Sequence, residues 1–126
     1  MNSARAMVFI AVLALVVAAC SGEGSAASVS PPAASDVTID AKGLAFVEKE
    51  VTVPAGRPFA MFFRNLDGAP HNVAIYTDSS LAKSLFVGET ITDATKLYTV
   101  PALEPGTYFF RCDLHPAMTG SLVAGD

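Results

Sequence analysis

The sequence predicts an all-β domain, a sandwich of about seven to eight strands that occupies residues 36–126. From Asp36 onward apolar residues alternate with polar ones in short bursts, the spacing of strands with one buried face. Gly, Pro, Asn and Asp separate these bursts. Two packed sheets are the simplest arrangement in which so many short strands bury their apolar residues.

Each burst defines one expected strand, and most of the connections between strands contain Gly or Pro. The turns with this chemistry are residues 54–56, 67–70 and 104–106, and residues 78–85 are the one stretch where a short helix is expected. The expected strands are Val37–Ala41, Glu50–Val53, Phe59–Asn65, Asn72–Tyr76, Thr90–Thr92, Thr95–Val100, Gly106–Arg111 and Gly120–Val123. The expected core residues are Phe46, Phe59, Phe62, Val73, Ile75, Phe109 and Val123.

An apolar run near the N-terminus, from Ala6 to Ala19, is typical of an export signal. It is about 14 residues long, shorter than the roughly 20 that a helix needs to cross a bilayer. The run ends in Val17-Ala18-Ala19-Cys20, which resembles the lipobox of bacterial lipoproteins. We therefore expect residues 1–19 to be a lipoprotein signal peptide and Cys20 to be lipidated. Simple secretion, with cleavage near residue 19 or 27, is the alternative.

The segment between the signal and the domain contains no large side chain to bury. Residues 20–35 are rich in Ser, Ala, Gly and Pro, a composition typical of a flexible tether. Lipid on Cys20 would hold the protein on a membrane. The expected location is thus an exported, membrane-anchored lipoprotein that faces the periplasm or the cell exterior.

Cysteine content and charge restrict the function further. The chain has two cysteines, so if Cys20 carries lipid, Cys112 has no disulfide partner. Outside the cytoplasm an unpaired thiol tends to become oxidised, so we expect the thiolate of Cys112 to bind a metal. The net charge is −4 and no basic patch is present, which argues against nucleic-acid binding.

The candidate metal ligands lie in two distant stretches. Cys112, His115 and Met118 place a thiolate, an imidazole and a thioether within one short segment, and His71 follows the turn at residues 67–70. Two His and one Cys in a trigonal plane with a distant Met are the ligands of blue-copper sites. Because two loops can meet at one end of a sandwich, we expect these four residues to bind one copper ion that alternates between Cu(II) and Cu(I).

This donor set suits one-electron transfer rather than catalysis. The thiolate and thioether favour Cu(I), and imidazole suits both oxidation states. If the protein fixes the ligands, little has to move when an electron arrives or leaves. We expect an electron carrier that is not an enzyme.

Two runs of the sequence resemble the cupredoxin family, in particular its plastocyanin and amicyanin branch. The run from Val51 to Tyr76 contains Pro70-His71-Asn72, and the run from Pro105 to Ala124 contains the Cys-x-x-His-x-x-Met spacing. The resemblance implies a Greek-key β-sandwich with His71, Cys112 and His115 as equatorial ligands and Met118 as the axial ligand. It also implies that the amide of Asn72 ties the two ligand loops together.

The expected electron port is the exposed edge of His115. The apolar residues around it suit transient docking of a redox partner protein to a monomer. Arg111 stands where plastocyanins have an aromatic residue, so their remote electron path does not carry over. The residues expected at this docking patch are Leu114, Pro116, Ala117, Ala69 and Pro70.

Other readings remain open. The same ligands would serve a module that delivers or buffers Cu(I) in the cell envelope. Considered alone, each residue has an ordinary structural interpretation. His71 could end a strand, Cys112 could be a small buried side chain, and Met118 could fill space in the core. A copper enzyme needs a second metal centre with further histidines, and the chain has only two.

Overall fold

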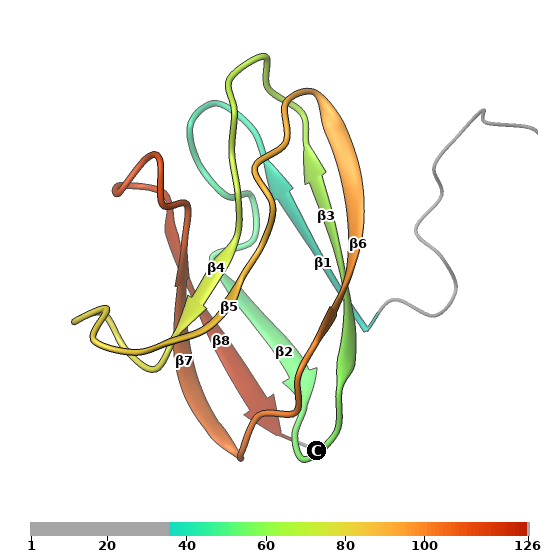
Figure 1. Cartoon of the computed structure of the whole chain (residues 1–126), viewed down its shortest axis with the longest axis vertical. Coiled ribbons are helices and arrows are strands. Elements are labelled where there is room, and N and C mark those ends of the chain that lie inside the picture. The colour runs from blue at the N-terminus through green and yellow to red at the C-terminus, as the bar shows by residue number, and fades with distance from the viewer. Residues whose placement is uncertain (1–35, 126) are drawn as a thin grey trace, which may run out of the picture.

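The structure, a computed structural model, describes residues 36–125, which form eight strands in two sheets (Figure 1). None of these residues lies in a helix, and thus no helix in this part of the chain could cross a membrane. The strands are β1 (Val37–Ala41), β2 (Glu50–Pro54), β3 (Phe59–Asn65), β4 (Ala74–Tyr76), β5 (Ser84–Val87), β6 (Ala94–Val100), β7 (Gly106–Arg111) and β8 (Thr119–Gly125).

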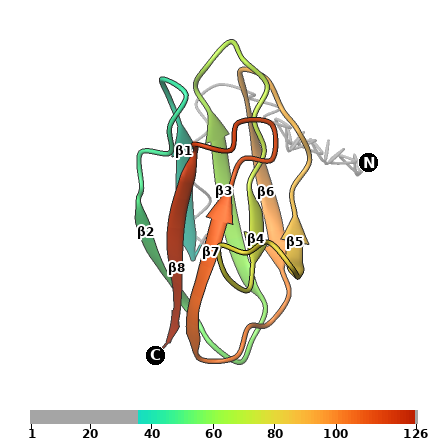
Figure 2. The ribbon, with the colours of Figure 1, turned by 90° about the vertical axis from the view of Figure 1, so that its left-hand side faces the viewer.

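The chain crosses repeatedly between the two sheets, which face each other across the core (Figure 2). The smaller sheet has the order β1-β3-β6, with β1 parallel to β3. The larger sheet has the order β2-β8-β7-β4-β5, with β2 parallel to β8. The predicted all-β sandwich is confirmed. Because consecutive strands often lie in opposite sheets, loops that are distant in sequence meet at the ends of the sandwich.

The core contains the inward-facing residues of both sheets. Phe46 contacts both sheets, with ring centroids 6.5 Å from Phe63 in β3 and 5.2 Å from Phe110 in β7. Four further expected core residues are buried: Phe59, Phe62, Val73 and Ile75.

For two core positions the prediction named the neighbour of the residue that is buried. Phe109 and Val123 are only partly buried, and their neighbours Phe110 and Leu122 occupy the core instead. Successive residues of a strand face opposite sides of the sheet, so only one of two adjacent apolar residues reaches the core. Where both neighbours are apolar, alternation alone does not identify the inward one.

Two expected elements are corrected by the structure. Residues 90–92 form no strand and contribute only an isolated bridge between Ile91 and His71. Residues 78–85 form no helix: the Asp78 carboxylate accepts a hydrogen bond from the Ser80 amide at 2.8 Å, which closes a turn before β5. The edge strand β5 was missed because it has only four residues and begins within the stretch where a helix was expected.

Three loops lie together at one end of the sandwich (Figures 1 and 2). They connect β1 to β2, β3 to β4, and β7 to β8. The loop between β3 and β4 carries His71, and the loop between β7 and β8 carries Cys112 and His115. The fold therefore brings the two stretches of candidate ligands to the same place.

Gly120 is expected to tolerate no side chain. A Cβ atom there would lie 2.2 Å from Cζ of Phe110, whose ring covers this residue across the β7–β8 pair. Gly120→Ala should therefore lower the free energy of unfolding by about 1–3 kcal/mol, as overpacking does. Urea unfolding of the metal-free protein measures the effect. Gly125→Ala, also in β8 but with open space around it, is the matched control, and an equal loss in both variants would contradict the prediction.

Candidate metal centre

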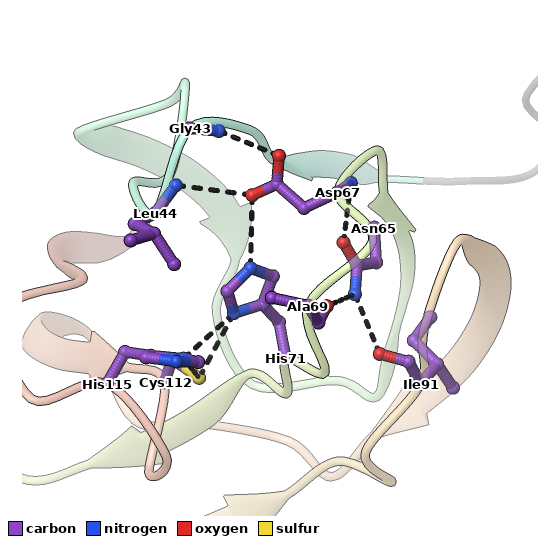
Figure 3. Close-up of polar contacts among 9 residues, drawn as sticks. All are labelled: Gly43, Leu44, Asn65, Asp67, Ala69, His71, Ile91, Cys112 and His115. Carbon is purple, nitrogen blue, oxygen red and sulfur yellow. Dashed lines mark hydrogen bonds and ion pairs between the residues drawn. The ribbon is translucent and has the colours of Figure 1, made fainter.

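Three potential ligand atoms converge where the two loops meet (Figure 3). Nδ1 of His71 lies 3.1 Å from Nδ1 of His115, and Sγ of Cys112 lies 3.8 Å and 3.7 Å from these nitrogens. His71 and Cys112 are fully buried, and His115 is partly exposed. Within residues 36–125, no other cluster brings three or more His, Cys, Asp or Glu ligands together.

The spacing of these three atoms fits one transition-metal ion. A triangle with these sides has its centre about 2.1 Å from each corner, close to the roughly 2.0–2.3 Å at which imidazole and thiolate bind a metal such as zinc. A thiolate with two imidazoles in one plane is the equatorial donor set of blue copper. The residues present therefore fit a single copper ion.

The backbone of the loop between β7 and β8 folds back on itself. The amide of Cys112 donates to the carbonyl of Met118 at 3.0 Å, and the amides of His115 and Met118 donate to the carbonyls of Cys112 and His115 at 3.3 and 2.9 Å. Cys112, His115 and Met118 are thus linked directly to one another. Met118 is also buried and belongs to the core cluster.

Asp67 fixes the imidazole of His71 from behind. Its carboxylate lies 3.1 Å from Nε2 of His71, so Nε2 donates to Asp67 and Nδ1 is left for the metal. The same carboxylate accepts hydrogen bonds from the amides of Gly43 and Leu44 at 2.9 and 3.2 Å, and these amides hold the pKa of Asp67 below its usual value. Sequence analysis missed Asp67. Its only signal was the position four residues before His71.

Asn65 shapes the loop that carries Asp67 and His71. Its side-chain amide donates to the carbonyls of Ala69 and Ile91 at 2.8 and 2.7 Å, and its Oδ1 accepts the amide of Asp67 at 2.9 Å. Asn65 is 1% exposed, so these bonds satisfy a buried side chain. The buried end of β3 thereby sets the position of the residues behind the metal centre.

Asn72 connects the two ligand loops. Its Oδ1 accepts the amide of Asp113, the residue after Cys112, at 2.8 Å. Its Nδ2 lies 3.3 Å from the carbonyl of Gly88. The residue after one imidazole is therefore bonded to the residue after the thiol.

Apolar side chains surround the exposed edge of His115. Leu114 is 43% exposed, and Pro116, Ala117 and Pro70 are exposed as well. The loops at this end contribute two exposed leucines that sequence analysis did not assign to the patch, Leu44 and Leu66. Cys20, the expected lipidation site, lies outside the described residues.

A β-sandwich that carries a Cys-His-His cluster of this size at one end defines a mononuclear copper protein of the electron-carrier class. Comparison with known proteins agrees. The family model of the cupredoxin-like domain matches residues 7–124. The chain therefore belongs to the cupredoxin family.

The similar proteins include two amicyanins. Amicyanin of Paracoccus versutus is 32% identical over 76% of this chain and 74% of its own length. Amicyanin-alpha of Methylorubrum extorquens is 30% identical over 94% of this chain and 98% of its own length.

Two solved structures are similar in fold. The crystal structure of amicyanin from Paracoccus versutus has a TM-score of 0.59 at 28% identity and covers 75% of this chain and 84% of its own. Reduced auracyanin from Roseiflexus castenholzii has a TM-score of 0.64 at 21% identity and covers 71% of this chain and 96% of its own.

These findings establish the cofactor and the class of activity. The cofactor of the chain is one copper ion. Like the amicyanins it resembles, the chain is a blue-copper electron carrier and not an enzyme.

We expect Asp67→Ala to weaken copper binding about 10- to 100-fold, the usual effect of removing a partner that orients a ligand. The variant frees Nε2 of His71 and leaves the amides of Gly43 and Leu44 without their acceptor, so it should also unfold at lower urea concentration. Competition with a chelator measures the affinity. Asp78→Ala, which removes a carboxylate bonded to one loop amide far from the centre, is the control. Equal affinities in the two variants would contradict the role of Asp67.

Proposed function

We propose that this protein carries single electrons between redox partner proteins at the outer face of a bacterial membrane. The copper ion would be held by His71, Cys112 and His115 in one plane, with Met118 as the weaker axial ligand. The observation that carries this proposal is the triangle formed by Nδ1 of His71, Sγ of Cys112 and Nδ1 of His115. When bound, copper supplies the single electron that is accepted and donated.

The protein's own contribution is to keep these ligands in place. Asp67 holds the imidazole of His71, and Asn65 holds the loop that carries Asp67. Asn72 holds the loop that follows Cys112. These contacts lie within the protein, and they would hold the ligands in place in both oxidation states of copper. A ligand set that does not rearrange keeps the barrier to electron transfer low.

Electrons would enter and leave through the partly exposed edge of His115. The surrounding Leu114, Pro116, Ala117 and Pro70 form a small apolar surface. Such a surface suits a redox partner that docks briefly and dissociates, because weak redox encounters use small interfaces.

The location follows from the N-terminal segment. Lipid on Cys20 would anchor the chain, and residues 20–35 would tether the domain to the membrane. β1 runs toward the end of the sandwich where the three loops lie, so a tether that precedes β1 would join the domain at the opposite end (Figure 1). The electron port would then remain accessible to partners in the periplasm or outside the cell.

Delivery or buffering of Cu(I) is the competing function, because the same donor atoms bind Cu(I) well. The two functions differ in what they require of the site. A carrier must retain copper in both oxidation states, whereas a delivery protein must release it. His71 and Cys112 are both buried. His71 is bonded to Asp67, and the amide of Cys112 to the carbonyl of Met118, which favours retention of copper.

The visible spectrum of the copper-loaded protein tests the carrier function. We expect an intense thiolate-to-copper absorption in the red, because Cys112 donates charge to Cu(II), and we expect ascorbate to bleach it. Cys112→Ser should abolish the band, and Met61→Leu, at a methionine buried in the core, should retain it. A colourless complex that exchanges Cu(I) rapidly would favour delivery.

Labelling with a radioactive fatty acid tests the anchor independently. We expect the bacterially expressed full chain to incorporate label, and Cys20→Ala to lose it, because Cys20 is the residue that the lipobox offers for lipidation. Cys112→Ala is the matched control and should remain labelled, since the thiol of Cys112 is buried. Equal labelling of the Cys20→Ala variant and the unmodified chain would rule out the anchor.

A further inference from the structure

The carboxylate of Asp113, immediately after Cys112, accepts hydrogen bonds from three side chains. Its Oδ1 lies 2.7 Å from the hydroxyl of Tyr76 and 3.1 Å from Nε of Arg111. Its Oδ2 lies 3.3 Å from Nδ2 of Asn72. Together with the bond from its own amide to Asn72, this makes Asp113 a heavily bonded residue directly beside a copper ligand.

The donors come from the outer face of the larger sheet. Tyr76 is the last residue of β4 and Arg111 the last of β7, and their neighbours Ile75 and Phe110 face the core. Side chains alternate along a strand, so Tyr76 and Arg111 lie on the opposite face. The guanidinium carbon of Arg111 lies 5.7 Å from the centroid of the Tyr76 ring, within reach of a cation–π contact.

The charges in this group complement one another. Burial raises the pKa of Asp113, but the hydrogen bonds from Tyr76, Asn72 and Arg111 outweigh burial and hold this pKa below its usual value. The hydrogen bond to Asp113 raises the pKa of Tyr76, so its hydroxyl keeps the proton that it donates. The Asp113 carboxylate thus pairs with the guanidinium of Arg111 and also accepts the hydroxyl of Tyr76.

The bond from Tyr76 differs from those of the other two tyrosines. Tyr98 and Tyr108 donate to the main-chain carbonyls of Glu89 and Glu104, which are neutral acceptors. Tyr76 donates to an ionised carboxylate, and such charge-assisted bonds are roughly twice as strong as neutral ones. Among these three tyrosines, Tyr76 is therefore the one whose hydroxyl is bonded to a carboxylate, and that carboxylate belongs to the residue that follows Cys112.

We propose that Tyr76 and Arg111, acting through the carboxylate of Asp113, are positioning residues that hold the thiolate of Cys112 from outside the sandwich. The inference rests on the proposed function, because it assigns these residues a role at the copper site. Asp113 is held at two points, its amide by Asn72 and its side chain by Tyr76 and Arg111. Because Asp113 follows Cys112 directly, these contacts hold the main chain from which the thiolate projects.

The test compares Tyr76→Phe with Tyr108→Phe in the copper-loaded protein. Both variants lose one tyrosine hydroxyl bonded at 2.7 Å, but only the first loses a bond to Asp113. For Tyr76→Phe we expect a changed ratio of the two thiolate-to-copper absorption bands. We also expect copper release to a chelator to be about threefold faster or more, because removal of residues that orient a ligand weakens metal binding. Tyr108→Phe should match the unmodified protein in both measurements.

Arg111→Gln provides a second, independent variant. It removes the guanidinium but keeps the hydroxyl of Tyr76 in place, and it should shift the band ratio in the same direction as Tyr76→Phe. Thermal unfolding of the metal-free variants separates a general loss of stability from an effect at the site. If Tyr76→Phe and Arg111→Gln both keep the spectrum and release rate of the unmodified protein, the positioning role is wrong and the carrier function stands. If the unmodified protein shows no thiolate-to-copper band, both proposals fail.

Discussion

The imidazole of His71 has no exposed surface, and both of its nitrogens have partners, one on His115 and one on Asp67. A buried polar group without a partner is costly, so Asp67 stabilises the ring in this position. Asp67 in turn is held by the amides of Gly43 and Leu44, from the loop between β1 and β2. The position of one metal ligand thus depends on three loops that are distant in sequence.

The loop that carries His71 is held in place by the paired strands on which it is mounted. The bridge between His71 and Ile91 links the loop after β3 to the segment that enters β6, and β3 and β6 are themselves paired. Asn65, at the end of β3, bonds to both segments. The loop that carries His71 is therefore anchored to the rigid part of the fold at both ends, which is what a site with little rearrangement requires.

The sequence predicted the elements whose limits are set by strong local signals. β1, β3 and β7 have the expected limits because turns or polar residues interrupt the alternation on both sides of each strand. His71, Cys112, His115 and Met118 were singled out because their residue types and spacing are unusual together.

What the sequence could not predict depends on contacts between distant residues. Asp67 is an ordinary turn residue until the fold places it behind His71, and nothing in a single sequence separates Phe109 from Phe110 as the inward residue. The role of Asp113 was hidden for the same reason, because Tyr76 lies 37 positions away along the chain. β5 was missed because pairing with β4, rather than its own short sequence, makes it a strand.

The parallel pairing of β2 with β8 has a consequence for how the chain reaches its native state. β2 begins at Glu50 and β8 ends at Gly125, so the edge of the larger sheet forms only after almost the whole domain has been synthesised. Pairings between segments so far apart form slowly, because a long loop must close before any contact compensates for the lost entropy. The thiol of Cys112 sits between β7 and β8 and is buried only in the finished fold. Until this edge of the sheet has formed, the sulfur is open to oxidants, and slow pairing lengthens that interval.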